Sequence, residues 1–130
     1  MNPFRKAVEA GDLTAIEDLL ADDIVFTSPV VFKPYPGKAI TAAILRAVTR
    51  VFTDFRYVRE IADAGGRDHA LVFKATVGGK EIEGCDFLHF DDDGRIDELT
   101  VMVRPLSAAH ALAEAMGAQF ERIAQEAADA

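Results

Sequence analysis

A single carboxylate stands among apolar neighbours in the segment 84–90, which reads Gly-Cys-Asp-Phe-Leu-His-Phe. Successive side chains of a β-strand point to opposite faces, so Asp86 would share a face with Ile82, Leu88 and Phe90. Burying a charge on an apolar face is costly, so Asp86 either has a buried partner or faces a cavity that a ligand can enter. The first case makes it a structural residue. The second makes it a general acid or base, or a hydrogen-bond donor to a ligand.

Three other polar side chains could lie near such a cavity. Ser28 precedes Pro29 and could contact a ligand, although a small polar residue in this position commonly ends a strand. Tyr35 lies in a proline-containing loop, and Tyr57 lies on an expected strand whose facing the pattern leaves open. Either tyrosine could supply a phenolic partner to a ligand, or could pack as an amphipathic side chain.

The three histidines have no partner at a spacing that indicates chemistry. His89 falls on the strand face opposite Asp86, which favours a packing or dimer contact. His69 begins a strand at a polar turn, and His110 lies one turn into the last helix, where it could close over a cavity mouth. Their roles stay open. No two histidines stand at helical spacing and Cys85 is the single cysteine, so the sequence predicts no metal site.

These residues need a scaffold, and the sequence indicates a mixture of helices and strands. The segment 2–20 has the pattern of two short helices broken at Gly11-Asp12, with Asp12 as the N-cap of the second. A longer helix is expected over 38–52, and a last one that Ser107 caps. Strands are expected at 24–28, 55–62, 70–77, 82–90 and 96–105, the last four as an antiparallel meander. This order predicts an α+β fold, with helices packed on a curved sheet.

Composition excludes several classes of partner. The chain has 130 residues, 50% of them hydrophobic, and a formal net charge of −8. This charge argues against nucleic acid, whose phosphates need a cationic surface, and against an anionic membrane surface. One cysteine allows no internal disulfide, the first ten residues lack an apolar signal core, and no apolar run is long enough to span a bilayer. We therefore expect a single cytoplasmic domain over residues 1–130.

Several short motifs also follow one another in a characteristic order. They are Gly11-Asp12-Leu13, Leu19 to Phe26, Pro29, Pro36-Gly37, Gly84-Cys85-Asp86, Asp92 to Ile96, and Val103 to Leu106. In this order they resemble the NTF2-like superfamily, especially its SnoaL-like and ketosteroid-isomerase-like members. The resemblance implies a cone-shaped, strongly curved antiparallel sheet wrapped around the N-terminal helices, an apolar cavity inside, and a homodimer through the outer sheet face. A helix over 107–128 would extend the minimal fold.

The resemblance also assigns roles to individual positions. Asp86 matches the cavity aspartate that, in the isomerase relatives, donates a hydrogen bond to a substrate oxyanion. Apolar surroundings that keep a carboxylic acid neutral would suit this role. The general base of those relatives falls on Ser28 here, and their partner tyrosine falls on Phe4. Steroid-type isomerisation would therefore lack both groups, and the Asp-Arg-Asp arrangement of the epoxide-hydrolase relatives has no clear match.

Alternation along the strands predicts which residues would surround a ligand. The predicted ligand-binding residues are Phe26, Ser28, Phe73, Leu88, Leu99, Val101 and Val103. Apolar residues also make a filled core by default, and in a cone the closed end can be filled while the wide end stays open. Many apolar groups around few polar ones suit a small hydrophobic molecule with one carbonyl or hydroxyl.

Three functions are consistent with these patterns. The first is a cofactor-free isomerase, cyclase or hydratase-like enzyme in which Asp86 is the acid or base. The second is a module that binds a small ligand without converting it, which would explain the missing base and tyrosine. The third is a dimerisation domain whose core is full and whose outer strand face carries the function.

Overall fold

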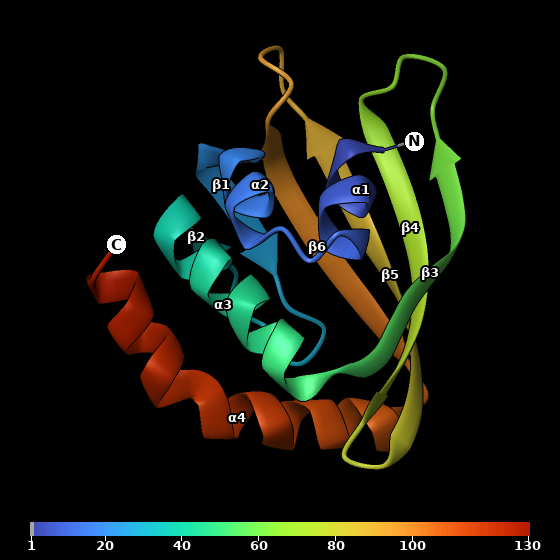
Figure 1. Ribbon diagram of the computed structural model, residues 1–130, viewed down its shortest axis with the longest axis vertical. Helices are drawn as coiled ribbons and strands as arrows, with labels where there is room; N and C mark the ends of the chain where they lie inside the picture. The colour runs from blue at the N-terminus through green and yellow to red at the C-terminus, as the bar shows by residue number, and fades with distance from the viewer. Residues whose placement is uncertain (1) are drawn as a thin grey trace.

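The computed structural model describes residues 2–130, and its elements follow the predicted order with one addition, a two-residue strand in the expected proline-containing loop (Figure 1). The elements are α1 (Pro3–Glu9), α2 (Leu13–Asp18), β1 (Leu20–Thr27), β2 (Tyr35–Pro36), α3 (Lys38–Val51), β3 (Thr53–Ala62), β4 (Asp68–Val77), β5 (Lys80–Phe90), β6 (Ile96–Arg104) and α4 (Leu106–Ala128). The α+β class and the curved sheet are therefore confirmed. No helix within residues 2–130 is both long and apolar enough to cross a lipid bilayer.

The six strands form one mixed sheet in the order β2-β1-β6-β5-β4-β3. Strands β3 to β6 form the predicted antiparallel meander, because tight turns reverse the chain between them. The sheet is antiparallel, as the resemblance implies, except at the pair β1–β6, which is parallel. These two strands are separated by most of the chain, and so no tight turn forces them to run in opposite directions.

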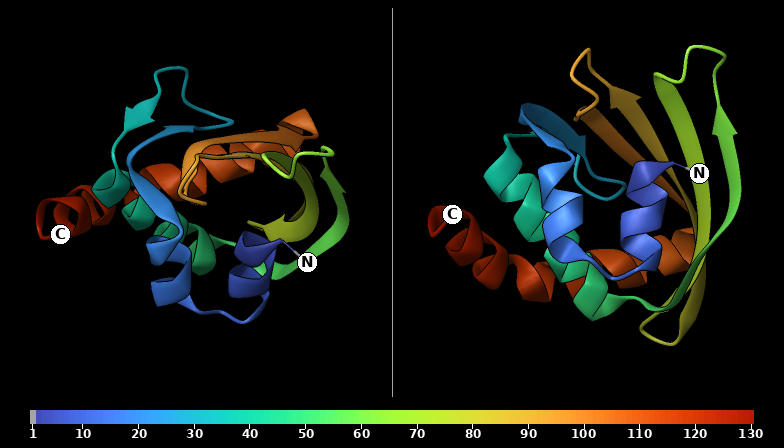
Figure 2. Two further views of the ribbon diagram at one scale, coloured as in Figure 1. Left: turned by 90° about the horizontal axis from the view of Figure 1, so that it is seen from above. Right: turned by 45° about the horizontal axis from the view of Figure 1, so that its top comes forward.

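The sheet wraps around the first three helices, and α4 lies across one end of it (Figures 1 and 2). Register shifts in β3–β4 and β5–β6 mark irregularities that bend a sheet locally. Gly84 on β5 leaves room for the ring of Phe73, which would collide with a Cβ at this position. The buried core lies between the inner sheet face and the helices, whereas Phe87 and Met102 on the outer face are 42% and 60% exposed.

Local capping explains where the helices begin. The Asp12 side chain accepts a hydrogen bond from the backbone N–H of Ala15 at 3.0 Å, which confirms it as the N-cap of α2. The prediction that Ser107 caps the last helix is wrong. The N-cap of α4 is Pro105, without a side-chain hydrogen bond, because β6 passes directly into the helix and Ser107 already lies in its first turn.

Candidate functional site

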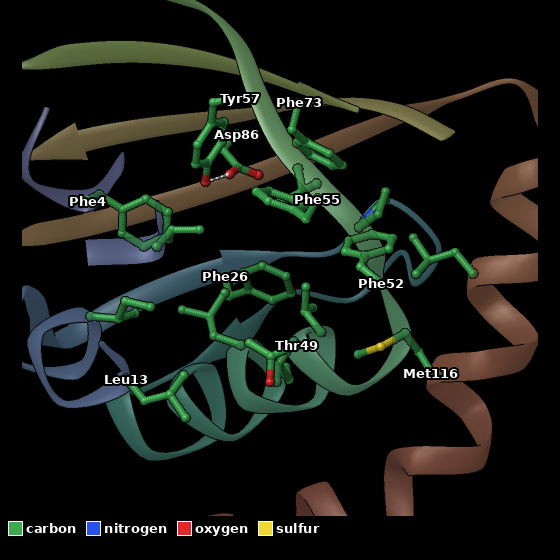
Figure 3. Close-up of a pocket in the computed structure, with 18 of the residues that line it drawn as sticks. Phe4, Leu13, Phe26, Thr49, Phe52, Phe55, Tyr57, Phe73, Asp86 and Met116 are labelled. Carbon is green, nitrogen blue, oxygen red and sulfur yellow. Dashed lines mark hydrogen bonds between the residues drawn. The ribbon is translucent and has the colours of Figure 1, made fainter. Parts of the chain in front are cut away.

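A cavity of about 440 Å³ lies between the inner face of the sheet and the helices (Figure 3). Its wall is mainly apolar, and the polar side chains among its residues are those of Glu9, Thr49, Tyr57 and Asp86. Glu9 and Thr49 are exposed, as is Leu13, so these three mark the mouth between α1–α2 and α3. Tyr57 and Asp86 are only 7% and 8% exposed, which makes them the buried polar groups of the cavity.

Tyr57 and Asp86 form a hydrogen-bonded pair at one end of this cavity (Figure 3). The Tyr57 hydroxyl donates to Asp86 Oδ2 at 2.7 Å. The residues lie on β3 and β5, with β4 between them. Asp86 is opposite Leu71 on β4 and Tyr57 is opposite Phe73, two positions further along the same face. The sheet register therefore places both side chains on the inner face, and curvature of the sheet brings them together.

Burial dominates the electrostatics of the pair. Removal from water raises the pKa of Asp86 from its ordinary value to about 7, and the hydrogen bond from Tyr57 partly opposes this rise. Burial also raises the pKa of Tyr57, helped by the nearby Asp86 carboxyl, so the phenol stays protonated. Near neutral pH the carboxyl group of Asp86 therefore exists in both protonation states, and it can accept or give a proton.

One oxygen of this carboxyl group remains available to a ligand. Tyr57 is the one hydrogen-bond partner of the Asp86 side chain among residues 2–130, and it engages Oδ2. Asp86 also lines the cavity, so Oδ1 is free to bond to a molecule inside. Phe4, Phe55 and Phe73 surround the pair with rings that offer no hydrogen bond to compete with a ligand (Figure 3).

The structure separates the predicted ligand-binding residues into two groups. Phe26, Phe73 and Val101 line the cavity together with Asp86, whereas Leu88, Leu99 and Val103 pack in the core outside it and Ser28 also lies outside. For Leu88 and Leu99, which are almost fully buried, the alternative of a filled core therefore describes their packing. Strand alternation identified the inner face but could not show how far along each strand the cavity extends.

Ser28 has a local structural role in the loop after β1. Its hydroxyl accepts hydrogen bonds from the backbone N–H groups of Val30 and Val31, at 3.1 and 3.3 Å. Both contacts stabilise the turn that follows Pro29, as small hydroxyl residues commonly do. Pro29 and Val30, rather than Ser28, contribute to the cavity wall.

Sequence reasoning missed most of the helical part of the wall. Leu45 and Val48 of α3 and Leu112 and Met116 of α4 line the cavity. Leu112 and Met116 stand four residues apart in the expected last helix, which places them on one face, but this spacing does not show which surface that face meets. The mixed pattern of β3 does not indicate which face Tyr57 is on, and so the sequence does not predict its pairing with Asp86.

None of the three histidines is among the described residues that line the cavity. His89 lies on the outer face, where its Nδ1 is 2.6 Å from Asp97 Oδ1. The bulge at this end of β5–β6 places His89 opposite Glu98 and leaves Asp97 as the extra residue. The ligating atoms of these three residues lie within 4.8 Å of one another, a grouping that the sequence did not predict. Exposed acidic groups often gather in this way without an ion, so the grouping alone does not define a metal site.

The other two histidines lie on separate surfaces. His69 stands edge-on to the ring of Phe90, with 5.1 Å between ring centroids, and its Nε2 is 3.0 Å from the backbone oxygen of Gly66. His110 is exposed on α4. Neither residue is close enough to the Tyr57–Asp86 pair to share its hydrogen bonds.

Comparison with known proteins agrees with this architecture. Residues 3–99 match the family model of the SnoaL-like domain. The chain belongs to the SnoaL-like family. The predicted resemblance to the NTF2-like superfamily is confirmed by this match and by the structures that share the fold. No protein of curated function matches the chain in sequence.

Among solved structures, a steroid delta-isomerase from Pseudomonas aeruginosa is 44% identical, with a TM-score of 0.86 over 92% of this chain and 87% of that one. An uncharacterised protein with a cystatin-like fold from Silicibacter pomeroyi is 33% identical, with a TM-score of 0.86 over 95% and 89% of the two chains. A putative polyketide cyclase from Pseudomonas putida is 22% identical, with a TM-score of 0.67 over 82% and 90%. The last similarity shows the fold alone.

Proposed function

We propose that this SnoaL-like protein is a cofactor-free enzyme that moves a proton on a small, hydrophobic carbonyl compound. The observation that carries the proposal is the buried Tyr57–Asp86 pair at one end of an apolar cavity. A volume of about 440 Å³ is within the range of small-molecule sites. The similarity to a protein described as a steroid delta-isomerase supports a ketone as the substrate class.

In the proposed reaction Asp86 is the general base toward a β,γ-unsaturated ketone. Its ionised carboxylate takes a proton from the carbon next to the carbonyl. The electron pair of the broken C–H bond forms a double bond to the carbonyl carbon, and the π pair of the C=O bond moves to the oxygen, which gives a conjugated dienolate. Once Asp86 is protonated, the Tyr57 hydroxyl can turn from Oδ2 to donate to the enolate oxygen. Asp86 then returns the proton to another carbon of the same molecule, which completes an isomerisation without any cofactor. A pKa of about 7 suits a group that must both take and return the proton.

A β,γ-unsaturated steroid ketone tests this proposal, because its conversion to the conjugated α,β-unsaturated ketone is visible by ultraviolet absorbance. We expect turnover by the wild-type protein and a 10²- to 10⁴-fold lower kcat for Asp86→Asn, roughly the contribution of a general base. Asparagine has the same shape and can still accept from Tyr57, so the fold should be kept. Ser28→Ala is the control, since its hydroxyl serves the turn and not the cavity. Turnover by Asp86→Asn at the wild-type rate would refute the assignment.

A second candidate function is ligand binding without chemistry. The resemblance places the general base of the isomerase relatives at Ser28. Here the Ser28 hydroxyl accepts hydrogen bonds from backbone N–H groups and lies outside the cavity, so it cannot act as a base there, and this favours binding alone. An enzyme would release a β,γ-unsaturated ketone with its double bond moved into conjugation, whereas a binding module would release it unchanged. Saturable binding of this ketone, with its double bond recovered in the original position, would therefore decide in favour of this second function.

We also propose that two copies pair through the outer sheet face. Phe87 and Met102 are exposed there although both are large and apolar, and they lie on the adjacent strands β5 and β6. Light scattering after size-exclusion chromatography should give the mass of a dimer, and Met102→Glu should shift it toward the monomer. A monomeric wild-type protein would refute this pairing.

A further inference from the structure

The last helix contributes a part of the cavity wall that lies away from the acid. Leu112 and Met116 of α4 line the cavity, and both lie beyond residue 99, where the family match ends. Figure 3 shows Met116 at the opposite end of the pocket from Asp86, with Phe55 and Phe52 between them. Helix α4 therefore closes the apolar end of the cavity rather than its polar end.

A chain of aromatic rings connects these two ends. The ring of Phe55 is edge-on to that of Tyr57, with 5.0 Å between centroids, and stacks with that of Phe52 at 5.8 Å. Both phenylalanines line the cavity. A ligand whose carbonyl group lies at Asp86 would therefore pass its apolar body along these rings toward Met116.

The position of α4 is held from both of its ends. Near its beginning, Ala108 and Leu112 are buried in a core cluster with Val77 and Ile82. Beyond Met116, the helix is tied to α3 by polar contacts. Arg46 Nε donates to Glu126 Oε2 at 2.8 Å, and Arg50 Nε donates to Gln119 Oε1 at 2.8 Å. The wall that Met116 provides is therefore fixed by the fold and is not a loose end of the chain.

We propose that Met116 determines the length of the ligand that this cavity accepts, an inference that rests on the proposed function for the position of the ligand's carbonyl group. Met116 is partly buried and packs against two core clusters, first the main core between the sheet and the helices, and second the smaller cluster that contains Ala108, Leu112, Val77 and Ile82. An unbranched thioether at such a position can be replaced with little loss of packing. Leu112 is 4% exposed inside the second cluster, so changing it would disturb the fold together with the cavity.

A series of 2-acetylnaphthalenes with a 6-alkyl chain from methyl to octyl tests this proposal, with binding measured from the fluorescence of the naphthalene. In the wild-type protein each added methylene should strengthen binding about fourfold until the chain reaches Met116, after which affinity should stop rising. Met116→Ala should move this break point to a chain about two or three methylenes longer. Met116→Phe should move it to a shorter chain, while the methyl compound binds as before. Phe120→Ala is the matched control, because Phe120 is a 48% exposed apolar residue of the same helix outside the cavity.

The outcomes separate this inference from the proposed function. A break point that is the same in wild type, Met116→Ala and Met116→Phe would overturn the inference, even if the protein isomerises ketones. A break point that moves as expected, in a protein that leaves every ketone unchanged, would support the inference and overturn the proposed catalysis. An equal shift in Phe120→Ala would also overturn the inference, because it would show a general loosening of α4. Failure of every compound to bind the wild-type protein would overturn both.

Discussion

Strand β5 contributes one residue to each of two hydrogen-bonded pairs. The pairs lie on opposite faces of the sheet and differ in their electrostatics. On the inner face Tyr57 donates to Asp86 at 2.7 Å, and on the outer face His89 and Asp97 are joined at 2.6 Å. The distances are nearly equal, but the first pair is buried and the second is partly exposed. Burial is the main cause of the raised pKa of Asp86, whereas the hydrogen bond that His89 donates to the Asp97 carboxylate is the main cause of the raised pKa of His89.

This difference separates a buried pair from a surface pair. Asp86 has little water around it, so its charged form is destabilised, which is the property that the proposed proton transfer requires. The His89–Asp97 pair has water to solvate both charges, and its interaction is therefore weak and screened by salt. A short hydrogen bond alone does not identify a functional group. The environment of the bond decides what the group can do.

The largest expected effect is on stability at high pH. The folded protein holds the Asp86 proton more tightly than the unfolded chain does, with a pKa of about 7 against the ordinary value of 3.8 for an aspartate. This contribution to stability is complete below about pH 4 and is lost as pH rises to about 7. Asp86→Asn carries no charge, so at pH 8 it should be more stable than wild type by on the order of 3 kcal/mol, with little difference at pH 4. Urea unfolding at both pH values measures this, and an equal difference at the two would contradict the buried, titrating carboxyl.

A smaller effect is expected from Tyr57→Phe. The hydrogen bond from Tyr57 lowers the pKa of Asp86, so its removal should raise that pKa further. The rise of kcat/KM with pH, which follows the ionised form of Asp86, should then move to higher pH. At pH 7 the loss should be about tenfold or more, since less of the base is ionised and the enolate loses a donor. Ketone isomerisation measured from pH 5 to 9 tests both effects, and an unmoved profile would show that Tyr57 does not act on Asp86.

The smallest effect is expected on the outer face. His89→Gln should lower Tm by at most about 3 °C at pH 5.5, where the histidine is charged and paired with Asp97. Because the folded state raises the pKa of His89, this contribution is present below the unfolded pKa near 6.5 and is lost as pH rises through the folded value. No difference should remain at pH 9, and high salt should reduce the one at pH 5.5. A large effect on isomerisation would mean that the two faces are coupled.

Much of the site could be inferred from local pattern. The alternation around Asp86 placed its side chain on an apolar face, and the glycine and proline signals marked the turns between strands. Period-two and helical patterns report which way a side chain faces within its own element. They report nothing about the element on the other side. For this reason the pattern predicts Leu88, Leu99 and Val103 at the cavity, whereas they pack in the core outside it.

The amino-acid sequence alone determines the features that depend on a few neighbouring residues. These are the order of the elements, the inward direction of Asp86, the outward direction of His89 and the N-cap at Asp12. Other features depend on segments that are far apart in the chain. They are the partner of Asp86, the parallel pairing of β1 with β6 and the place of Met116 in the cavity wall. Tyr57 reaches Asp86 because an intervening strand and the curvature of the sheet set their spacing. The raised pKa of Asp86 then follows from the water that the assembled walls exclude, which no stretch of neighbouring residues can specify.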